Sequence, residues 1–188
     1  MTKSGISKII KEHVDSALRG EGIKIAMPRE TPWLVDEAND WLEENITEDT
    51  RVLEYGSGCS SVWFAKRTKH FTTVENHAGW AMAVTQITGM PVILCKRPYD
   101  KAVTSTVTGG EYDFILVDGR DRVLCATQAV EMLVPGGVLM LDDSERVKYD
   151  PIRELTSTWE LIACVLHPAD EELQIRAKET TWWRKPKP

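Results

Sequence analysis

The chain has 188 residues, of which 42% are hydrophobic and 28% are charged, a composition typical of one globular domain. This composition excludes disordered and collagen-like proteins. With 29 acidic and 23 basic residues the net charge is −6, which argues against general binding to nucleic acids. The N-terminus lacks the apolar core of a secretory signal and no run of about 18 apolar residues occurs, so we expect a cytoplasmic protein that does not enter membranes.

The cysteines are too widely spaced for a metal finger, since neighbouring ones are at least 30 residues apart and none forms a Cys-x-x-Cys pair. They are Cys59, Cys95, Cys125 and Cys164. In a cytoplasmic protein we expect reduced thiols, and we predict that all four are buried.

The first 48 residues have helical patterns. Residues 5–19 place apolar side chains at helical spacing, and Thr31-Pro32 is typical of the start of a second helix, predicted from Trp33 to about Asn45. We predict that residues 1–48 form an N-terminal helical cap on a main domain of residues 49–188, the two making one unit.

From residue 51 onward, short apolar runs alternate with helical patterns, which is typical of parallel βαβ units. The predicted strands are 51–55, 71–75, 91–95, 112–118 and 138–142. The predicted helices are 61–67, 77–88 and 121–133. Two further strands, 159–166 and 173–183, have only a short acidic turn between them, so we predict an antiparallel hairpin at the C-terminal end of the sheet.

A glycine turn follows the first predicted strand. Gly56 and Gly58 let the backbone approach a ligand closely, and the helix that starts next offers free N–H groups. Glu75 stands 19 residues after Gly56, at the end of the next strand, where an acidic residue suits the two hydroxyls of a ribose. This combination predicts a site for a nucleoside-containing cofactor.

Two cofactor classes fit such a turn. A dinucleotide presents a pyrophosphate and favours glycine or alanine at the position that Ser61 occupies. S-adenosylmethionine instead carries an ammonium and a sulfonium, so Glu54, two residues before Gly56, would be favourable beside it and unfavourable beside a pyrophosphate. The residues favour S-adenosylmethionine. The alternatives are a nicotinamide-dependent oxidoreductase and a noncatalytic module that binds S-adenosylmethionine.

Over about residues 50–183 the sequence resembles the class I S-adenosylmethionine-dependent methyltransferases, in particular those that methylate oxygen on small molecules. The resemblance lies in Glu54–Gly58, Thr73–Glu75, Tyr112–Asp118 and Leu133–Asp143. It implies a Rossmann-like, doubly wound seven-stranded α/β sheet of order 3-2-1-4-5-7-6, with strand 7 antiparallel and helices at the N-terminus. Ser60 departs from the family, which has a third loop glycine there, and we expect it to cap the helix predicted over 61–67.

The predicted cofactor-binding residues come from the glycine turn and from two strand ends. They are Glu54, Gly56, Ser57, Gly58, Glu75, Asn76 and Asp118. The resemblance implies that the glycine turn contacts the methionine part, that Glu75 holds the ribose, and that residues 96–99 flank the adenine with Asn76.

Three aspartates are the predicted catalytic residues. Asp118 ends the fourth strand and Asp142 and Asp143 end the fifth, and ligands of open α/β sheets bind at such carboxyl ends. Methyl transfer needs alignment and, for an acceptor that carries a proton, a base. Asp118 is the first candidate, and clustered carboxylates raise one another's pKa, which suits a base. The alternative is that Asp142 or Asp143 caps a turn.

The same three aspartates resemble the Mg²⁺ ligands of catechol-type methyltransferases, which carry Asp-Asn where this chain has Asp142-Asp143. Because arginines crowd these loops, we predict metal-independent methyl transfer, with a divalent metal at Asp118, Asp142 and Asp143 as the alternative.

Arginines beside the aspartates indicate an anionic acceptor, since guanidinium groups bind carboxylates and phosphates. The predicted substrate residues are Arg120, Arg122, Arg146 and Trp33. The alternatives are that the arginines neutralise nearby acids such as Asp121 and that Trp33 packs in a helix. The Asn/Asp-Pro-Pro-Tyr signature of amino-methyltransferases is absent, which favours oxygen on a small molecule over nucleic acid. Whether copies of the chain associate stays open.

Overall fold

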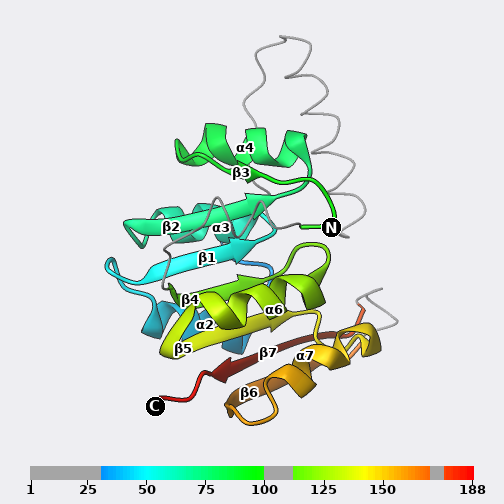
Figure 1. The fold of residues 1–188 in the computed structure, drawn as a ribbon. Helices are drawn as coiled ribbons and strands as arrows, with labels where there is room; N and C mark the ends of the chain where they lie inside the picture. The colour runs from blue at the N-terminus through cyan, green and yellow to red at the C-terminus, as the bar shows by residue number, and fades with distance from the viewer. Residues whose placement is uncertain (1–30, 100–111, 170–175) are drawn as a thin grey trace.

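The computed structural model describes residues 31–99, 112–169 and 176–188, and its centre is a seven-stranded sheet (Figure 1). The strands are β1 Arg51–Tyr55, β2 His70–Glu75, β3 Ile93–Leu94, β4 Tyr112–Val117, β5 Leu133–Asp142, β6 Glu160–His167 and β7 Lys178–Arg184. Their order is β3-β2-β1-β4-β5-β7-β6. β7 pairs antiparallel with both β5 and β6, while the other pairs are parallel. The predicted topology is confirmed.

Helices cover both faces of the sheet. They are α2 Asp36–Asn45, α3 Cys59–Ala65, α4 Ala78–Thr88, α6 Arg122–Met132, the 3₁₀ turn η1 Val147–Tyr149 and α7 Asp150–Leu155. In Figure 1, α6 and α7 lie in front of the sheet and α2 and α3 lie behind it. Because helices cover the central strands on both faces, every residue of β1 except Arg51 and every residue of β4 except Asp113 is buried.

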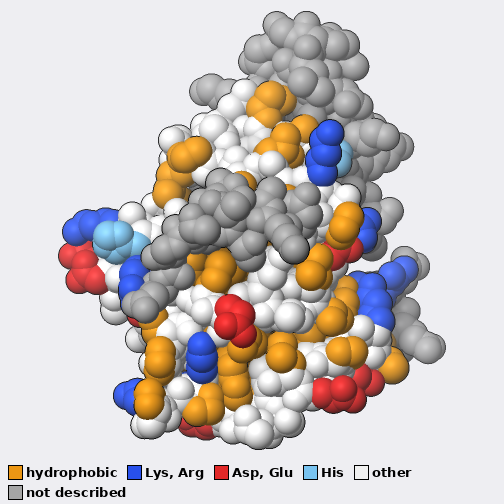
Figure 2. All heavy atoms as spheres, viewed as in Figure 1, with side chains coloured by type: hydrophobic (Ala, Val, Ile, Leu, Met, Phe, Trp, Pro, Cys, Tyr) orange, Lys and Arg blue, Asp and Glu red, His pale blue; other side chains and the backbone are white. Residues whose placement is uncertain are grey.

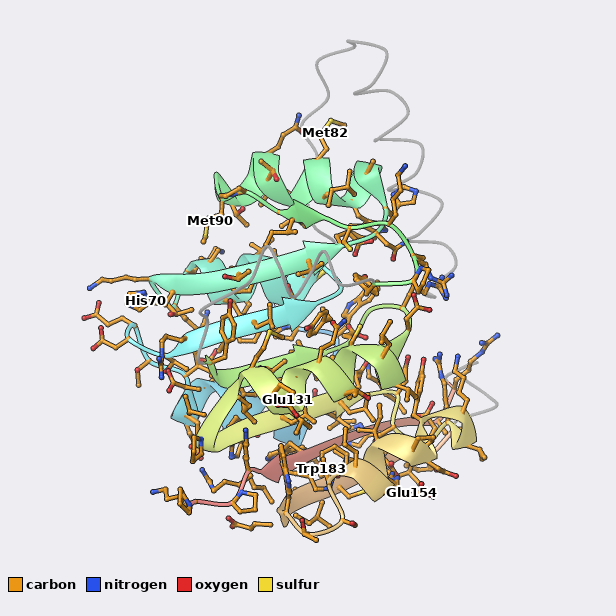
Figure 3. All side chains as sticks on the ribbon, in the orientation of Figure 1. His70, Met82, Met90, Glu131, Glu154 and Trp183 are labelled. Carbon is orange, nitrogen blue, oxygen red and sulfur yellow. The ribbon has the colours of Figure 1, made fainter. Side chains whose placement is uncertain are left out.

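Each face has its own hydrophobic core. Trp183 of β7, labelled in Figure 3, belongs to one core, which also contains Cys125 of α6 and Ile152 of α7. On the other face, Leu42 of α2 and Phe64 of α3 pack against the sheet. The N-terminal helix that the structure describes therefore shares a core with the sheet. The boundary between residues 48 and 49 stays a prediction, and the helix predicted over 5–19 lies outside the described residues.

Several predicted element ends and one predicted burial are wrong. α2 begins at Asp36 with Val35 as its N-cap, so Thr31-Pro32 does not start it. α3 begins at Cys59 with Gly58 as its N-cap, because Ser60 turns inward instead of capping. α7 was not predicted, although Pro151 sits in its first turn. Cys164 is exposed because β6 is the outermost strand, whereas the other three cysteines are buried.

In the part of the chain that the structure describes, no helix combines the length and the apolar character that crossing a bilayer requires.

Candidate functional site

The glycine turn follows β1 in the chain and contacts the loop that follows β4. Gly56 has φ +102°, and a Cβ placed on it would overlap the backbone of Gly119, which follows β4. The Gly56 N–H donates to the Val74 carbonyl at 2.8 Å, so the turn is also tied to β2. A side chain at residue 56 would disturb this contact between two loops. Gly56 is therefore required because the backbone of the turn lies against the backbone at Gly119. The sequence had indicated that the glycine serves a close approach to a ligand.

Gly58 faces open space. Its backbone is extended, and a Cβ placed there would have no described atom within 4 Å. Its N–H donates to Ser61 Oγ at 2.8 Å, which holds the turn against the first residues of α3. As far as the described residues go, the turn thus presents bare backbone with no side chain against it.

The Glu75 carboxylate stands beside the turn, 7% exposed. Its Oε1 accepts from the N–H groups of Asn76 at 2.8 Å and His77 at 2.7 Å, and its Oε2 accepts from the N–H of Ser57 at 3.1 Å. Burial raises the pKa of Glu75, while these N–H groups oppose the rise. A carboxylate has about four acceptor sites. One site on Oε2 is therefore left for a ligand hydroxyl.

Glu54 lies beneath the turn and is fully buried. Its carboxylate accepts hydrogen bonds from the hydroxyls of Ser60 and Ser61, and from Thr73 Oγ1 at 2.7 Å. Burial raises its pKa to about 7 against the opposing effect of the hydroxyls. The sequence predicted Glu54 at the cofactor but not this set of hydroxyls. Direct contact between Glu54 and a cofactor stays a prediction.

The segment that follows β3 lies at the same edge of the sheet as the glycine turn and Glu75. The Tyr99 hydroxyl, on a fully buried ring, donates to Asn76 Oδ1 at 3.4 Å. Arg97 pairs with Asp121 at 2.6 Å, which ties this segment to the start of α6. The prediction that residues 96–99 border a nucleobase remains untested, but the segment does stand next to the end of β2.

The three predicted catalytic aspartates come together as expected. One carboxylate oxygen from each of Asp118, Asp142 and Asp143 lies within 4.8 Å of the others. They meet because β4 and β5 are neighbours and end at the same edge of the sheet. Since Gly119 contacts Gly56, this cluster also lies next to the glycine turn. Asp118, whose side chain is 23% exposed, is the most accessible of the three.

Arg122 lies inside this cluster, 5% exposed. Its guanidinium donates to the carboxylates of Asp118 at 2.8 Å and Asp143 at 3.1 Å. It also donates to the carbonyl oxygens of Gly119 at 3.0 Å, Asp118 at 2.7 Å, and Asp142. All three of its nitrogens are engaged within the protein, which favours the alternative that Arg122 neutralises nearby acids; its contact with substrate stays a prediction.

Arg146 is half exposed and pairs with Asp143 at 2.7 Å and with Glu145 at 3.5 Å, so it too neutralises acids. Arg120 is exposed. Figure 2 shows basic and acidic side chains together along the right-hand rim, where Figure 1 places the carboxyl ends of the parallel strands. For Arg122 and Arg146 the structure therefore favours the alternative that these arginines neutralise neighbouring acids.

Asp142 is completely buried, with two partners from β7 that the sequence analysis missed. Thr180 Oγ1 donates to Asp142 Oδ1 at 3.0 Å, and Lys178 Nζ lies 3.2 Å from Oδ2. No described donor is aligned for a hydrogen bond to Oδ2. Burial, and then the charge of Asp118, raise the pKa of Asp142 to about 7. Polar residues within the last predicted strand were the available signal for these partners.

Lys178 also donates to the carbonyl of Trp33, so the chain before α2 is fastened at this edge. The Trp33 ring is half buried and packs near Ala83 of α4. Its predicted contact with substrate stays a prediction.

The aspartate cluster is a poor fit for a divalent metal. Three carboxylates within 4.8 Å have the right chemistry. However, each already faces a cation of the chain: Arg122 for Asp118 and Asp143, and Lys178 for Asp142. A metal would have to displace or repel these groups.

No protein-family model matches the sequence, and no curated protein matches it either. Solved structures do match. The N-methyltransferase NodS from Bradyrhizobium japonicum, in complex with S-adenosylhomocysteine, is 14% identical with a TM-score of 0.59, covering 96% of this chain and 98% of that one. A methyltransferase from Pyrococcus furiosus is 15% identical with a TM-score of 0.58, covering 96% and 99%. The tRNA (m1A58) methyltransferase TrmI from Aquifex aeolicus is 14% identical with a TM-score of 0.60, covering 95% and 76%.

At these identities the likeness is one of fold. The chain has the Rossmann-like fold of the class I S-adenosylmethionine-dependent methyltransferases.

Proposed function

We propose that the protein is an S-adenosylmethionine-dependent methyltransferase that acts on oxygen in a small molecule. The observation that carries the proposal is one arrangement at the carboxyl edge of the sheet. The glycine turn opens at Gly58 and is bordered by the Glu75 carboxylate and by Asp118. Open α/β sheets bind their ligands at this edge. The methyltransferase fold supports methyl transfer from S-adenosylmethionine, whereas the choice of oxygen rests on the absence of the Asn/Asp-Pro-Pro-Tyr signature.

S-adenosylmethionine, when bound, supplies a methyl group on an activated sulfonium. The chain then has to bind the cofactor and the acceptor, align them, and take up the proton of the acceptor hydroxyl. Glu75 would accept from a ribose hydroxyl at the site left on Oε2, and the backbone at Gly58 would border the methionine part. Asp118 would hold the acceptor hydroxyl and, with the buried carboxyl of Asp142 behind it, take its proton. An anionic group on the acceptor would have to be bound by Arg120, since Arg122 and Arg146 are engaged.

A pyrophosphate cofactor is disfavoured by charge. Glu54 and Glu75 place two carboxylates at the turn, and Ser61 is used to bind Glu54 and the Gly58 N–H. Titration calorimetry with S-adenosylhomocysteine and with NAD separates the two classes. Binding of NAD alone would contradict the proposal. Binding of S-adenosylhomocysteine without turnover on any hydroxylated acceptor would favour the noncatalytic module.

Changing Gly58 to alanine and then to valine should weaken S-adenosylhomocysteine binding stepwise. For valine we expect a loss of at least about tenfold in affinity, which corresponds to ~1.4 kcal/mol. The reason is that each added carbon projects into the open region beside the turn. The melting temperature should change little, because residue 58 has an extended backbone that any residue adopts. Equal binding by all three proteins would show that the cofactor lies elsewhere.

Glu75→Ala should lower the affinity for S-adenosylhomocysteine by about 1.5–3 kcal/mol, the range for a hydrogen bond to a charged group. Calorimetry measures this loss. Glu43→Ala is a matched control, since it removes a glutamate on α2 that pairs with Arg67 away from the turn. An unchanged affinity in Glu75→Ala would overturn the ribose assignment.

A further inference from the structure

The strand β6 is the last strand of the sheet and lies along its lower edge in Figure 1. One of its edges pairs with β7, and no strand in the described part of the chain pairs with the other. β6 has eight residues, whereas β3 at the opposite end of the sheet has two. The N–H and C=O groups along the outer edge of β6 are therefore a long template on which a further strand can pair.

Two exposed leucines lie on one face of β6. Leu161 is 55% exposed and Leu166 is 52% exposed. Residues five positions apart would point to opposite faces of a regular strand, but β6 has a bulge at Ile162. Leu161 consequently lies opposite Trp183 and Leu166 opposite Glu179, and these two residues, four apart on β7, share the face on which α7 lies. Charged side chains usually guard an open edge, so two leucines there indicate a partner.

The two ends of β6 carry groups of opposite charge. Glu160 lies opposite Arg184 and His167 lies opposite Lys178, so both point to the face away from α7. Glu160 pairs with Arg184 at 3.1 Å, and His167 pairs with Glu37 at 2.8 Å. Glu160 is exposed and His167 is half exposed, so each can accept a further neighbour of opposite charge.

We propose that β6 pairs antiparallel with β6 of a second copy of the chain, about a two-fold axis at Cys164. Residues directly opposite each other in an antiparallel pair point to the same face, and a two-fold axis makes every contact occur twice. The bulge at Ile162 lets the pairing meet both conditions. The facing pairs are then Ala163 with Val165, Leu161 with Leu166, and Glu160 with His167.

The position of the axis follows from the strand itself. With the axis at Cys164, both ends of β6 find partners, leucine meets leucine, and an acidic group meets a basic one. Moved to Val165, the axis would set His167 against Ala163 and Leu161 against Pro168, which lies outside the strand and has no N–H. A foreign strand could use the same edge, but this symmetry of apolar and charged residues about one position favours a second copy. One pair of short strands buries little area, so we expect micromolar affinity.

Disulfide formation at Cys164 gives the first test. Directly opposite residues of an antiparallel pair have Cα atoms about 4.5–5.5 Å apart, within the span of about 4.4–6.8 Å that a disulfide bridges. Mild oxidation of the wild-type protein should therefore give a covalent dimer. The other three cysteines are buried, so Cys164→Ser should abolish this cross-link.

Two variants that both carry Cys164→Ser test the register. One has Leu161→Cys in addition and the other has Leu166→Cys. A mixture of the two should cross-link, because position 161 faces position 166 of the other copy. Neither variant should cross-link alone, because each position lies several residues away from its own counterpart.

Sedimentation over a range of concentrations measures the association without a cross-link. Leu161→Lys should weaken the dimer by at least about tenfold, because it places a charge in both copies of the contact. Leu94→Lys is the matched control. Leu94 is 56% exposed on β3, at the opposite end of the sheet, and its replacement should leave the association unchanged.

Three results would overturn the inference: a wild-type protein that is monomeric at every concentration, a mixture that cross-links no better than either variant alone, or two lysine variants with equal effects. The inference is independent of the proposed function, because β4, β5 and β7 lie between β6 and the strand that leads to the glycine turn. Binding of S-adenosylhomocysteine by Leu161→Lys should match the wild type, and it reports on the proposed function whatever the state of association.

Discussion

Asp118→Asn should lower methyl transfer by about 10²–10⁴-fold, the usual contribution of a general base. Asparagine keeps the size of the side chain and can still accept from Arg122, so the change removes the charge and the proton acceptor while retaining the packing. The measurement is the rate of S-adenosylhomocysteine release with a hydroxylated acceptor found by screening. Affinity for S-adenosylhomocysteine should change much less than turnover.

Asp113→Asn is the matched control for this variant. Asp113 lies near the start of β4, the strand that ends just before Asp118, and it pairs with Arg51 at 2.8 Å. Its replacement should leave turnover unchanged. An equal loss in both variants, or full activity of Asp118→Asn, would contradict the role of Asp118.

The pH dependence of turnover offers an independent check. The pKa of Asp142 is raised to about 7 by burial and by the charges of Asp118 and Asp143, against Lys178 and Arg122. Once ionised, Asp142 makes Asp118 in front of it a stronger proton acceptor, so turnover should rise with pH through about 7 and then level off. Asp142→Asn should remove this rise. A profile that is flat from pH 6 to 8 in the wild-type protein would contradict this contribution of Asp142.

Arg122→Met should destabilise the protein by about 3–5 kcal/mol, the typical cost of removing one partner from a buried ion pair. The guanidinium holds two carboxylates and three carbonyl oxygens at the ends of β4 and β5. Without it, Asp118 and Asp143 would face each other and the carbonyl groups would lose their donors. Denaturant unfolding at pH 8, where the carboxyls are ionised, measures the loss.

Arg120→Met controls for the loss of positive charge in the same loop. Arg120 is exposed, and its replacement should change the free energy of unfolding by no more than about 0.5 kcal/mol. Arg122→Lys should recover only part of the stability, because one ammonium cannot reach the acceptors that a planar guanidinium spans. If the free energy of unfolding of Arg122→Met lies within about 1 kcal/mol of the wild-type value, the hydrogen bonds of Arg122 do not stabilise the ends of β4 and β5.

Local patterns in the sequence were enough to predict the sheet and the place of the site. Apolar runs alternating with helical spacing imply parallel strands whose carboxyl ends share one edge. Polar residues directly after such runs must then gather there, which is why Asp118, Asp142 and Asp143 were expected together and are found within 4.8 Å of one another. The strand order came from the family resemblance, and the register of the strands confirms it.

The partners of each polar side chain depended on the tertiary structure. Arg122 was predicted to face substrate, but its acceptors include a carbonyl 20 residues away on the next strand. Ser60 was expected to cap a helix, but it turns to Glu54 beneath the turn. Gly56 meets Gly119, which is 63 positions away in the sequence. Periodicity reports which face of an element is buried; it does not report which groups lie within 3 Å across two elements.

The sequence by itself determined the fold class, the position of the glycine turn after β1, the position of Glu75 at the end of β2, and the edge of the sheet at which the aspartates meet. Each of these follows from residue type and spacing along one strand or turn. The tertiary structure alone decided which charges are neutralised. It gives the aspartates Arg122 and Lys178, whereas among the described residues Glu54 has only hydroxyl partners. The physical reason is that the state of a buried charge depends on every group packed around it, and those groups come from segments far apart in the chain.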